Sequence, residues 1–207
     1  MSELKSSNEP ISCKVILVGD SGVGKTSIIN RYLKQYSENQ KATIGASYAN
    51  KLEKIDDFEI NFDIWDTAGQ ERFRSVNTIF YKEAYVCIMV YDITKPESFE
   101  SIKDYWYNTV SDNASGKIIY GIAGNKIDLY EEEKVDQNKV KEYCDSIDAL
   151  FKATSAKQNT CIDDIFKELG KKFIQSDLFK YLISQNTDNN KKLDLNKSDK
   201  KKKKGCC

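Results

Sequence analysis

The chain has 207 residues, and its 32 basic residues balance its 32 acidic ones. This length excludes a large multidomain enzyme, because single cores run to about 100–200 residues, and the absence of histidine excludes Ser-His-Asp and Cys-His catalysis and His-ligated zinc. Because the net charge is zero, the molecule as a whole does not attract the negative charge of nucleic acid, and we expect no nucleic-acid partner.

Apolar periodicity predicts strands that alternate with helices along the chain. An apolar run before Gly19 is typical of a buried strand, apolar residues recur at helical spacing from Lys25, and two alternating runs joined by Asp56 and Asp57 predict a hairpin. In chain order we expect a strand at 12–18, a helix from 25, a hairpin of 47–55 and 58–65, a strand at 84–91, a helix at 96–110, a strand at 117–124, a helix near 137–144, a strand at 149–153 and a final helix from 162 to 173.

This alternation indicates a mostly parallel sheet that helices cover on both faces. Ligands of such sheets bind beyond the carboxyl ends of the strands. We expect a flexible N-terminus at 1–10, one domain at 11–176 and a flexible tail at 177–207, which from about residue 184 is too rich in Asn, Asp, Lys and Ser to bury a core.

Residues 19–26 match the P-loop pattern in full and lie between a predicted strand and a predicted helix. Its glycines allow successive N–H groups to turn toward phosphate oxygens at the positive end of a helix. Lys25 is then expected to reach the β- and γ-phosphates, and the Thr26 hydroxyl to ligate Mg²⁺. A plain glycine-rich turn is the alternative, which the full match in this context disfavours.

Two stretches that follow later strands predict which base is bound. Asn125, Lys126 and Asp128 follow one strand, and residues 155–157 follow another. A carboxylate such as Asp128 accepts hydrogen bonds from N1–H and the 2-amino group of guanine, whereas adenine has no matching donor pair. The Lys126 stem can lie along the purine, and the Ala156 N–H can donate to the exocyclic oxygen. Either stretch alone is typical of a loop or a cap, but together they favour guanine.

Residues 66–70 follow the predicted hairpin and supply candidates for metal binding and catalysis. Asp66 suits Mg²⁺ held through water, and the Gly69 N–H suits a γ-phosphate. Gln70 could orient an attacking water, with an exposed polar loop residue as the alternative. Thr43 becomes a candidate Mg²⁺ ligand only in the company of these motifs.

These motifs, in this order, resemble the Ras superfamily of small GTPases, and residues 43–48 and 65–75 are similar to the two switch signatures of the Rab family. The resemblance covers about 11–176 and the last two cysteines. It implies an α/β P-loop NTPase fold with a six-stranded, mostly parallel sheet, one antiparallel hairpin strand and five flanking helices. It also implies that Thr43 meets Mg²⁺ and the γ-phosphate, and that Tyr36 lies edge-on to the guanine.

The predicted catalytic residues are Lys25 and Gln70, the predicted Mg²⁺ ligands are Thr26, Thr43 and Asp66, and the predicted GTP-binding residues are Asp20, Ser21, Gly22, Val23, Gly24, Lys25, Thr26, Ser27, Tyr36, Thr43, Gly69, Asn125, Lys126, Asp128, Ser155, Ala156 and Lys157. The resemblance implies a monomer that regulates vesicular traffic. No residue is an obvious arginine finger in cis, so we expect slow GTP hydrolysis that an activating protein accelerates. Its other implied partners are effectors, an exchange factor, a GDP dissociation inhibitor and a prenylation escort protein.

By the same resemblance, Tyr48, Trp65 and Phe80 form the aromatic patch that effectors read. Tyr48 departs from the more usual Phe, and residues 82–84 depart from the usual Arg-Gly-Ala. Packing within a sheet is the alternative role for these rings, because aromatic residues favour strands.

The end of the chain is strongly basic although the whole chain is neutral. Residues 188–207 contain eight Lys and three Asp, which gives them a net charge of +5. A Cys-a-a-X box would need Cys at position 204, which is Lys. The terminal Cys206 and Cys207 instead resemble the doubly geranylgeranylated ends of Rabs, and two lipid chains anchor a protein stably. The lysine run alone would fit a solvated tail or a nuclear signal.

We therefore expect the protein at the cytoplasmic face of an intracellular membrane, with a cytosolic pool. Residues 44–47 resemble the endosomal branch of Rabs, which implies an endosomal membrane. The other four cysteines have no zinc or redox spacing and are expected to be reduced core thiols. Two alternatives stay open: a P-loop kinase or ATPase, which predicts no guanine preference, and a scaffold that binds nucleotide without hydrolysing it.

Overall fold

The protein is described by a computed structural model, which covers residues 10–37, 43, 46–67 and 74–185. Its six-stranded sheet has the order β2-β3-β1-β4-β5-β6, and only β2 and β3 pair antiparallel. The strands are β1 (Ile11–Val18), β2 (Ala46–Ile55), β3 (Phe58–Thr67), β4 (Val86–Asp92), β5 (Ile119–Asn125) and β6 (Leu150–Thr154). The expected mostly parallel sheet with one hairpin strand is confirmed.

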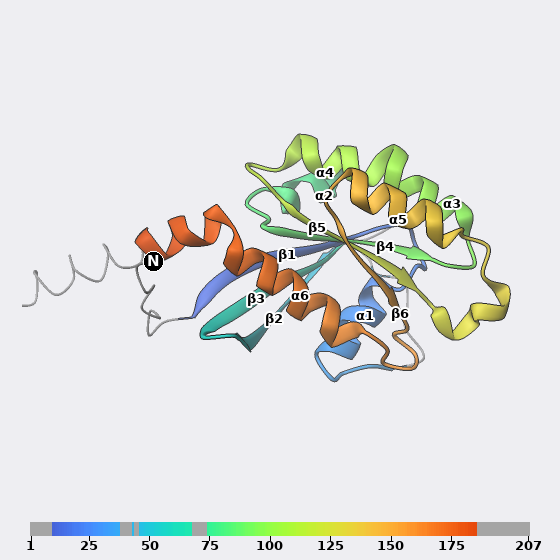
Figure 1. Cartoon of the computed structure of the whole chain (residues 1–207), viewed down its shortest axis with the longest axis horizontal. Helices are drawn as coiled ribbons and strands as arrows, with labels where there is room; N and C mark the ends of the chain where they lie inside the picture. Colours follow the sequence, from blue (N-terminus) through green and yellow to red (C-terminus); the bar gives the residue numbers. More distant parts are fainter. Residues whose placement is uncertain (1–9, 38–42, 44–45, 68–73, 186–207) are drawn as a thin grey trace, which may run out of the picture.

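Helices cover both faces of this sheet, with α1 and α6 on one face and α2 to α5 on the other (Figure 1). They are α1 (Lys25–Tyr32), α2 (Arg74–Tyr81), α3 (Pro96–Ser101), a π-helical turn (Ile102–Trp106), α4 (Tyr107–Asn113), a 3-10 helix (Ile127–Glu132), α5 (Gln137–Ser146), α6 (Ile162–Gln175) and a helix over 177–185. If 96–113 is counted as one interrupted helix, the described residues contain seven helices. The two beyond the expected five are the 3-10 helix and 177–185.

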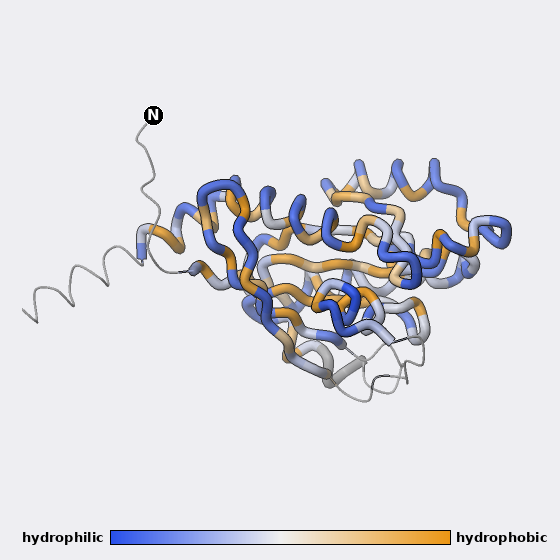
Figure 2. Tube along the Cα trace, turned by 90° about the horizontal axis from the view of Figure 1, so that it is seen from below, coloured by the Kyte–Doolittle hydropathy of each residue, from blue (hydrophilic) through white to orange (hydrophobic). Residues whose placement is uncertain are grey.

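Each face of the sheet has its own hydrophobic core, because successive strand residues point to opposite faces. Leu17 belongs to the core beneath α1 and α6, whereas its neighbour Ile16 belongs to the core beneath α3, α4 and α5. Hydrophobic residues accordingly concentrate in the strands and on the inward sides of the helices (Figure 2). The sheet is thus buried on both sides, and its carboxyl edge is left for polar residues.

The folded part extends beyond residue 176, the expected end of the domain. Residues 177–185 are helical, and Phe179 and Ile183 are buried in the core beneath α6. The Phe179 ring packs edge-on against Phe58, with 4.9 Å between centroids, and against Phe173 at 5.4 Å. These apolar side chains hold the helix on the domain. Within the described ranges, no helix is long and apolar enough to cross a bilayer.

Candidate functional site

The parallel register brings the ends of several strands to one edge of the sheet. Leu17 near the end of β1 pairs with Asp66 near the end of β3. Asn125 at the end of β5 pairs with Asp92 of β4 on one side and Thr154 of β6 on the other. The P-loop and the loop at 155–157 continue directly from β1 and β6, so the predicted phosphate, metal and base residues share the carboxyl edge.

Two glycines let the P-loop pass close to its neighbours. Gly19 has φ +142° and Gly24 has φ +103°, and both are conformations that L side chains rarely adopt. A Cβ at Gly19 would overlap the Val90 carbonyl, and one at Gly24 would overlap the Asn125 amide. Gly24 caps the start of α1, so the loop leads straight into a helix N-terminus, where backbone N–H groups favour an anion.

Lys25 is buried although it carries a cation, with 5% of its surface exposed. Its Nζ donates to the Gly19 carbonyl over 2.8 Å and to the Asp20 carbonyl over 3.0 Å. Burial lowers the pKa of Lys25 to about 8, while the negative charges of Asp66 and Asp20 act in the opposite direction. The lysine thus presents an ammonium group that an additional anion would stabilise.

Three oxygen-bearing side chains from separate segments converge next to this lysine. The Thr26 hydroxyl donates to Asp66 Oδ2 over 2.6 Å and lies 2.6 Å from the Thr43 hydroxyl. Thr43 also donates to Asp66 Oδ2, over 3.3 Å. Burial raises the pKa of Asp66, against the lowering effect of the Thr26 hydrogen bond and of Lys25.

The second carboxylate oxygen of Asp66 supplies a test of metal binding. Oδ1 is buried and has no hydrogen-bond partner among the described residues. A buried oxygen of this kind is costly unless it is paired, and a set of hydroxyl and carboxylate oxygens is the donor type that Mg²⁺ takes. The residues present therefore fit a Mg²⁺ ion.

On the base side, Asn125 links three segments. Its Nδ2 donates to the Val23 carbonyl of the P-loop over 2.9 Å. Its Oδ1 accepts from the Thr154 hydroxyl over 3.3 Å and from the Ala156 N–H over 3.2 Å. The Ala156 N–H, expected to face the guanine oxygen, thus donates to Asn125 in this structure. Asn125 is placed as a connector of the loops that surround the predicted base position.

Asp128 and Lys126, the other two residues predicted to contact the base, also have protein partners. Ser155 is fully buried, and its hydroxyl donates to Asp128 Oδ1 over 2.5 Å. Lys126 adopts a left-handed backbone conformation, and its Nζ pairs with Asp92 Oδ2 over 2.6 Å. Burial alone would raise the pKa of Asp92, but the hydrogen bonds from Lys126 and Thr94 outweigh it and lower that pKa. Sequence patterns gave no signal for Asp92.

Arg31 is a further residue that sequence reasoning missed. It lies on α1, and its guanidinium donates to the carbonyls of Ala156 over 2.7 Å and Lys157 over 2.8 Å. It also lies over the Tyr36 ring, 3.7 Å from the centroid. Arg31 thus ties the loop after β6 to the residue expected beside the guanine. Its position on a helix outside every motif explains why no pattern indicates it.

The three aromatic residues expected to form the effector patch do lie together. Tyr48 and Trp65 are partners in the β2–β3 register, with ring centroids 5.3 Å apart, and Trp65 stacks on Phe80 at 5.1 Å. Tyr48 is 53% exposed, and its hydroxyl donates to Asp63 Oδ1 over 2.6 Å. Trp65 therefore contacts both of the other rings, and Tyr48 is open to solvent.

The remaining predicted residues differ in where they lie. Gly69, Gln70, Cys206 and Cys207 lie outside the described residues. Ser21 and Gly22 are exposed at the crest of the P-loop, and Ser27 lies in the first turn of α1. As expected for core thiols, Cys13, Cys87 and Cys144 are buried and free, and burial raises their pKa values, whereas Cys161 is only partly buried.

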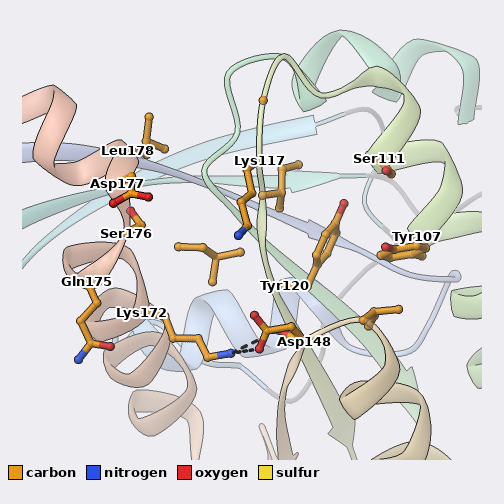
Figure 3. A pocket seen from close by; sticks show the side chains of 14 residues that line it. Tyr107, Ser111, Lys117, Tyr120, Asp148, Lys172, Gln175, Ser176, Asp177 and Leu178 are labelled. Atoms are coloured by element: carbon orange, nitrogen blue, oxygen red, sulfur yellow. Dashed lines mark hydrogen bonds and ion pairs between the residues drawn. The ribbon is translucent and has the colours of Figure 1, made fainter.

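A cavity of about 740 Å³ lies away from this edge, between α4, the start of β5 and the end of α6 (Figure 3). Lys117, Tyr120 and the ion pair of Lys172 with Asp148 line it. None of the predicted nucleotide, metal or aromatic-patch residues does so. The cavity is therefore separate from the candidate site.

The glycine-rich loop, the buried lysine and the oxygen cluster define a P-loop nucleotide-binding protein on a mostly parallel sheet. Residues 14–175 match the model of the Ras family. The chain therefore belongs to the Ras family.

Two relatives illustrate the similarity. The chain is 41% identical to Ras-related protein Rab-22A of Homo sapiens over 165 residues, which cover 79% of this chain and 84% of the relative. It is also 41% identical to Ras-related protein RabJ of Dictyostelium discoideum over 162 residues, 78% of this chain. That match spans 63% of the length of RabJ. With these relatives, the chain is a small GTPase of the Rab type.

Proposed function

We propose that the chain is a switch in vesicular membrane traffic whose state is set by GTP or GDP bound at the carboxyl edge. The convergence of Thr26, Thr43 and Asp66 beside the buried Lys25 carries this proposal. These residues come from the P-loop, from the segment before β2 and from the end of β3. A triphosphate with its metal can therefore bind all three segments at once, whereas a diphosphate lacks the γ-phosphate group.

Positioning and charge neutralisation supply the catalysis, because phosphoryl transfer leaves the protein little covalent chemistry. Lys25 and the P-loop N–H groups stabilise the charge that builds on the γ-phosphate and on the leaving oxygen. Thr26, Thr43 and Asp66 would hold Mg²⁺, which would supply further neutralisation of the phosphate charge. Gln70 orients the water that attacks in line, and Gly69 donates its N–H to the γ-phosphate.

The base is read by Asp128 and the loop after β6. The Asp128 carboxylate accepts from N1–H and the 2-amino group of guanine, and its position is supported by the Ser155 hydroxyl. Lys126 covers the purine with its stem while Asp92 holds its ammonium group. This arrangement favours guanine over adenine by its hydrogen-bond pattern.

Competition and hydrolysis assays test this proposal directly. Labelled GDP on the purified chain should be displaced by GTP and GDP but not by ATP, and bound GTP should be converted slowly to GDP and phosphate. Displacement by ATP would favour a P-loop kinase or ATPase. Lasting GTP without phosphate release, even with an activating protein, would favour a scaffold.

Gln70→Leu tests the catalytic role separately from binding. The variant should bind GTP as the wild type does but hydrolyse it more slowly, with or without an activating protein. Thr78, which lies on α2 and follows Gln70 in the sequence, offers a control as Thr78→Ser. Single-turnover hydrolysis at the wild-type rate in Gln70→Leu would contradict the role given to this glutamine.

Loss of the γ-phosphate then changes a surface. Thr43 contacts Thr26 and precedes β2. The exposed Tyr48 of β2 contacts Trp65 of β3. We infer that γ-phosphate holds the segments with Thr43 and Gly69, that GDP releases them, and that effectors read Tyr48, Trp65 and Phe80 in the GTP form. An exchange factor and an activating protein set the balance. Limited proteolysis should give different cutting patterns for the GDP and GTP forms, and identical patterns would contradict the switch.

Attachment to membranes is assigned to lipids on Cys206 and Cys207. Two chains anchor stably where one is marginal, and each nearby lysine adds about 1 kcal/mol toward an anionic leaflet. A prenylation escort protein would deliver the chain, and a GDP dissociation inhibitor would maintain the cytosolic pool. The resemblance at residues 44–47 supports an endosomal membrane. A Cys206→Ser/Cys207→Ser variant should be cytosolic, and its persistence on membranes would contradict the anchor.

A further inference from the structure

A buried tryptophan outside every predicted motif contacts the P-loop. The indole Nε1–H of Trp106 donates to Asp20 Oδ1 over 2.9 Å, although the two residues are 86 positions apart. Trp106 is fully buried in the core beneath α3 to α5. A buried indole N–H requires a partner, and a carboxylate is a strong one. The contact therefore joins the P-loop to the core of the domain.

The backbone around Trp106 is unusual as well. The residue ends the π-helical turn that separates α3 from α4, where the Tyr107 N–H donates to the Ile102 carbonyl five positions back. Single π-helical turns inside longer helices are rare and are frequent at functional sites. The wider turn thus ends at the residue whose indole bonds to the P-loop.

Asp20 also interacts with Lys25, the predicted phosphate-binding lysine, in two ways. Its backbone carbonyl accepts a hydrogen bond from Lys25 Nζ over 3.0 Å. Its carboxylate charge also favours the charged form of that lysine. A carboxylate fixed by Trp106 therefore restrains both the backbone of the loop and the electrostatic environment of the ammonium group.

We propose that Trp106 is a positioning residue for the bound nucleotide. By holding the Asp20 carboxylate, it restrains the P-loop in the conformation that surrounds the phosphates and so slows nucleotide release. The inference rests on the proposed function, because it concerns the same site, and it assigns a role to Trp106, which lies outside the phosphate, metal and base motifs.

Release of a fluorescent GDP from the full chain tests the proposal. Protein loaded with methylanthraniloyl-GDP and Mg²⁺ is chased with excess unlabelled GDP. Trp106→Phe keeps a large apolar ring but removes the donor, so we expect release to be about tenfold faster, the effect of losing one hydrogen bond to a charged group. Asp20→Ala should have a similar effect. Asp20→Asn keeps an acceptor for the indole and should release the nucleotide at an intermediate rate.

The double variant separates positioning from general loosening of the fold. If the two residues act through one contact, Trp106→Phe/Asp20→Ala should release GDP no faster than Asp20→Ala alone. Val110→Ala is the matched control, because Val110 is fully buried in the same core on α4. It should lower the melting temperature without changing the release rate.

Each outcome has a distinct meaning. Release from folded Trp106→Phe at the wild-type rate, or effects that multiply in the double variant, would overturn the positioning role. If Trp106→Phe does not fold, the Asp20 pair decides, and a wild-type rate in Asp20→Ala overturns the inference. Wild-type protein that retains no labelled GDP would contradict the proposed function itself, before any variant is compared.

Discussion

The base side and the phosphate side of the site differ in how the protein satisfies their polar groups. On the base side, Asn125 uses both ends of its amide for protein contacts, and Asp128 accepts from Ser155. On the phosphate side, the buried Lys25 donates to two backbone carbonyls, and Asp66 has one buried oxygen without a partner among the described residues.

This difference shows where each half obtains its geometry. Base-side loops are fixed by hydrogen bonds that form on folding, so the proposed site for guanine would be preorganised. On the phosphate side, burial lowers the pKa of Lys25 and raises that of Asp66, so both charged forms are disfavoured there. A phosphate next to the lysine and a cation next to the carboxylate would relieve these costs, which couples ligand binding strongly to the stability of this half.

The largest expected effect is at Lys25 and has opposite signs for binding and folding. Lys25→Met should weaken GDP binding by at least about 100-fold, since it removes the charge that contacts phosphate. It should also raise the melting temperature of the nucleotide-free protein, because a buried cation is replaced by an apolar chain of similar length. Binding and thermal melts measure both, and Lys54→Met, at an exposed position on β2, is the control. A lower melting temperature for nucleotide-free Lys25→Met would contradict the assigned cost.

The free energy of unfolding of the nucleotide-free protein should also depend on pH through the buried Lys25. Burial lowers the pKa of Lys25 from 10.5 to about 8, so above pH 8 the unfolded chain binds more protons at this residue than the folded one. The free energy of unfolding should therefore gain a favourable contribution from Lys25 as pH rises from 8 toward 10.5. Urea denaturation of wild type and Lys25→Met at pH 7 and pH 9 should show this gain in the wild type only.

Asp128→Asn probes the base side and should change specificity while keeping the fold. The amide loses the acceptor for one guanine donor but can donate to the 2-oxo group of xanthine. GTP should bind about 100-fold more weakly and the xanthine nucleotide more tightly. The Asn oxygen can still accept from Ser155, so the loop should persist. A variant that retains the guanine preference in competition assays would refute the assigned contact.

A smaller effect is expected at Arg31, which supports the base-side loop from α1. Arg31→Ala removes both hydrogen bonds to the carbonyls after β6 and should speed GDP release by about three- to tenfold. Arg31→Lys keeps a cation over Tyr36 and one hydrogen-bond donor, so its rate of GDP release should lie between those of the wild type and Arg31→Ala. If the lysine variant and the alanine variant release GDP equally fast, the forked contact is not what holds the loop.

The smallest effect is expected at Tyr48, which belongs to neither half. Tyr48→Phe removes the hydroxyl that binds Asp63 at an exposed position, so the free energy of unfolding should change by less than about 0.5 kcal/mol. GDP affinity should match the wild type. A change in nucleotide release in this variant would mean that the aromatic patch and the site are coupled even in the GDP form.

Local pattern predicted much of the fold but missed elements whose stability is tertiary. The strand expected at 12–18 is Ile11–Val18, and the hairpin connects at the two expected aspartates. Periodicity did not indicate α2, which has eight residues and so only about two turns. It also did not indicate the helix over 177–185, because that helix depends on Phe179 packing against Phe58 and Phe173.

The sequence by itself determined the class of chemistry, because a P-loop and two guanine-type motifs need only the right residue types at short spacings after strands. It also indicated a parallel sheet, whose register then brought the motifs together. Only the tertiary structure decided how these residues are held: Trp106 on Asp20, Arg31 on the loop after β6, and Asp92 on Lys126. These partners lie 34 or more positions apart along the chain. Their contacts depend on how helices and strands pack in three dimensions, which no local spacing encodes.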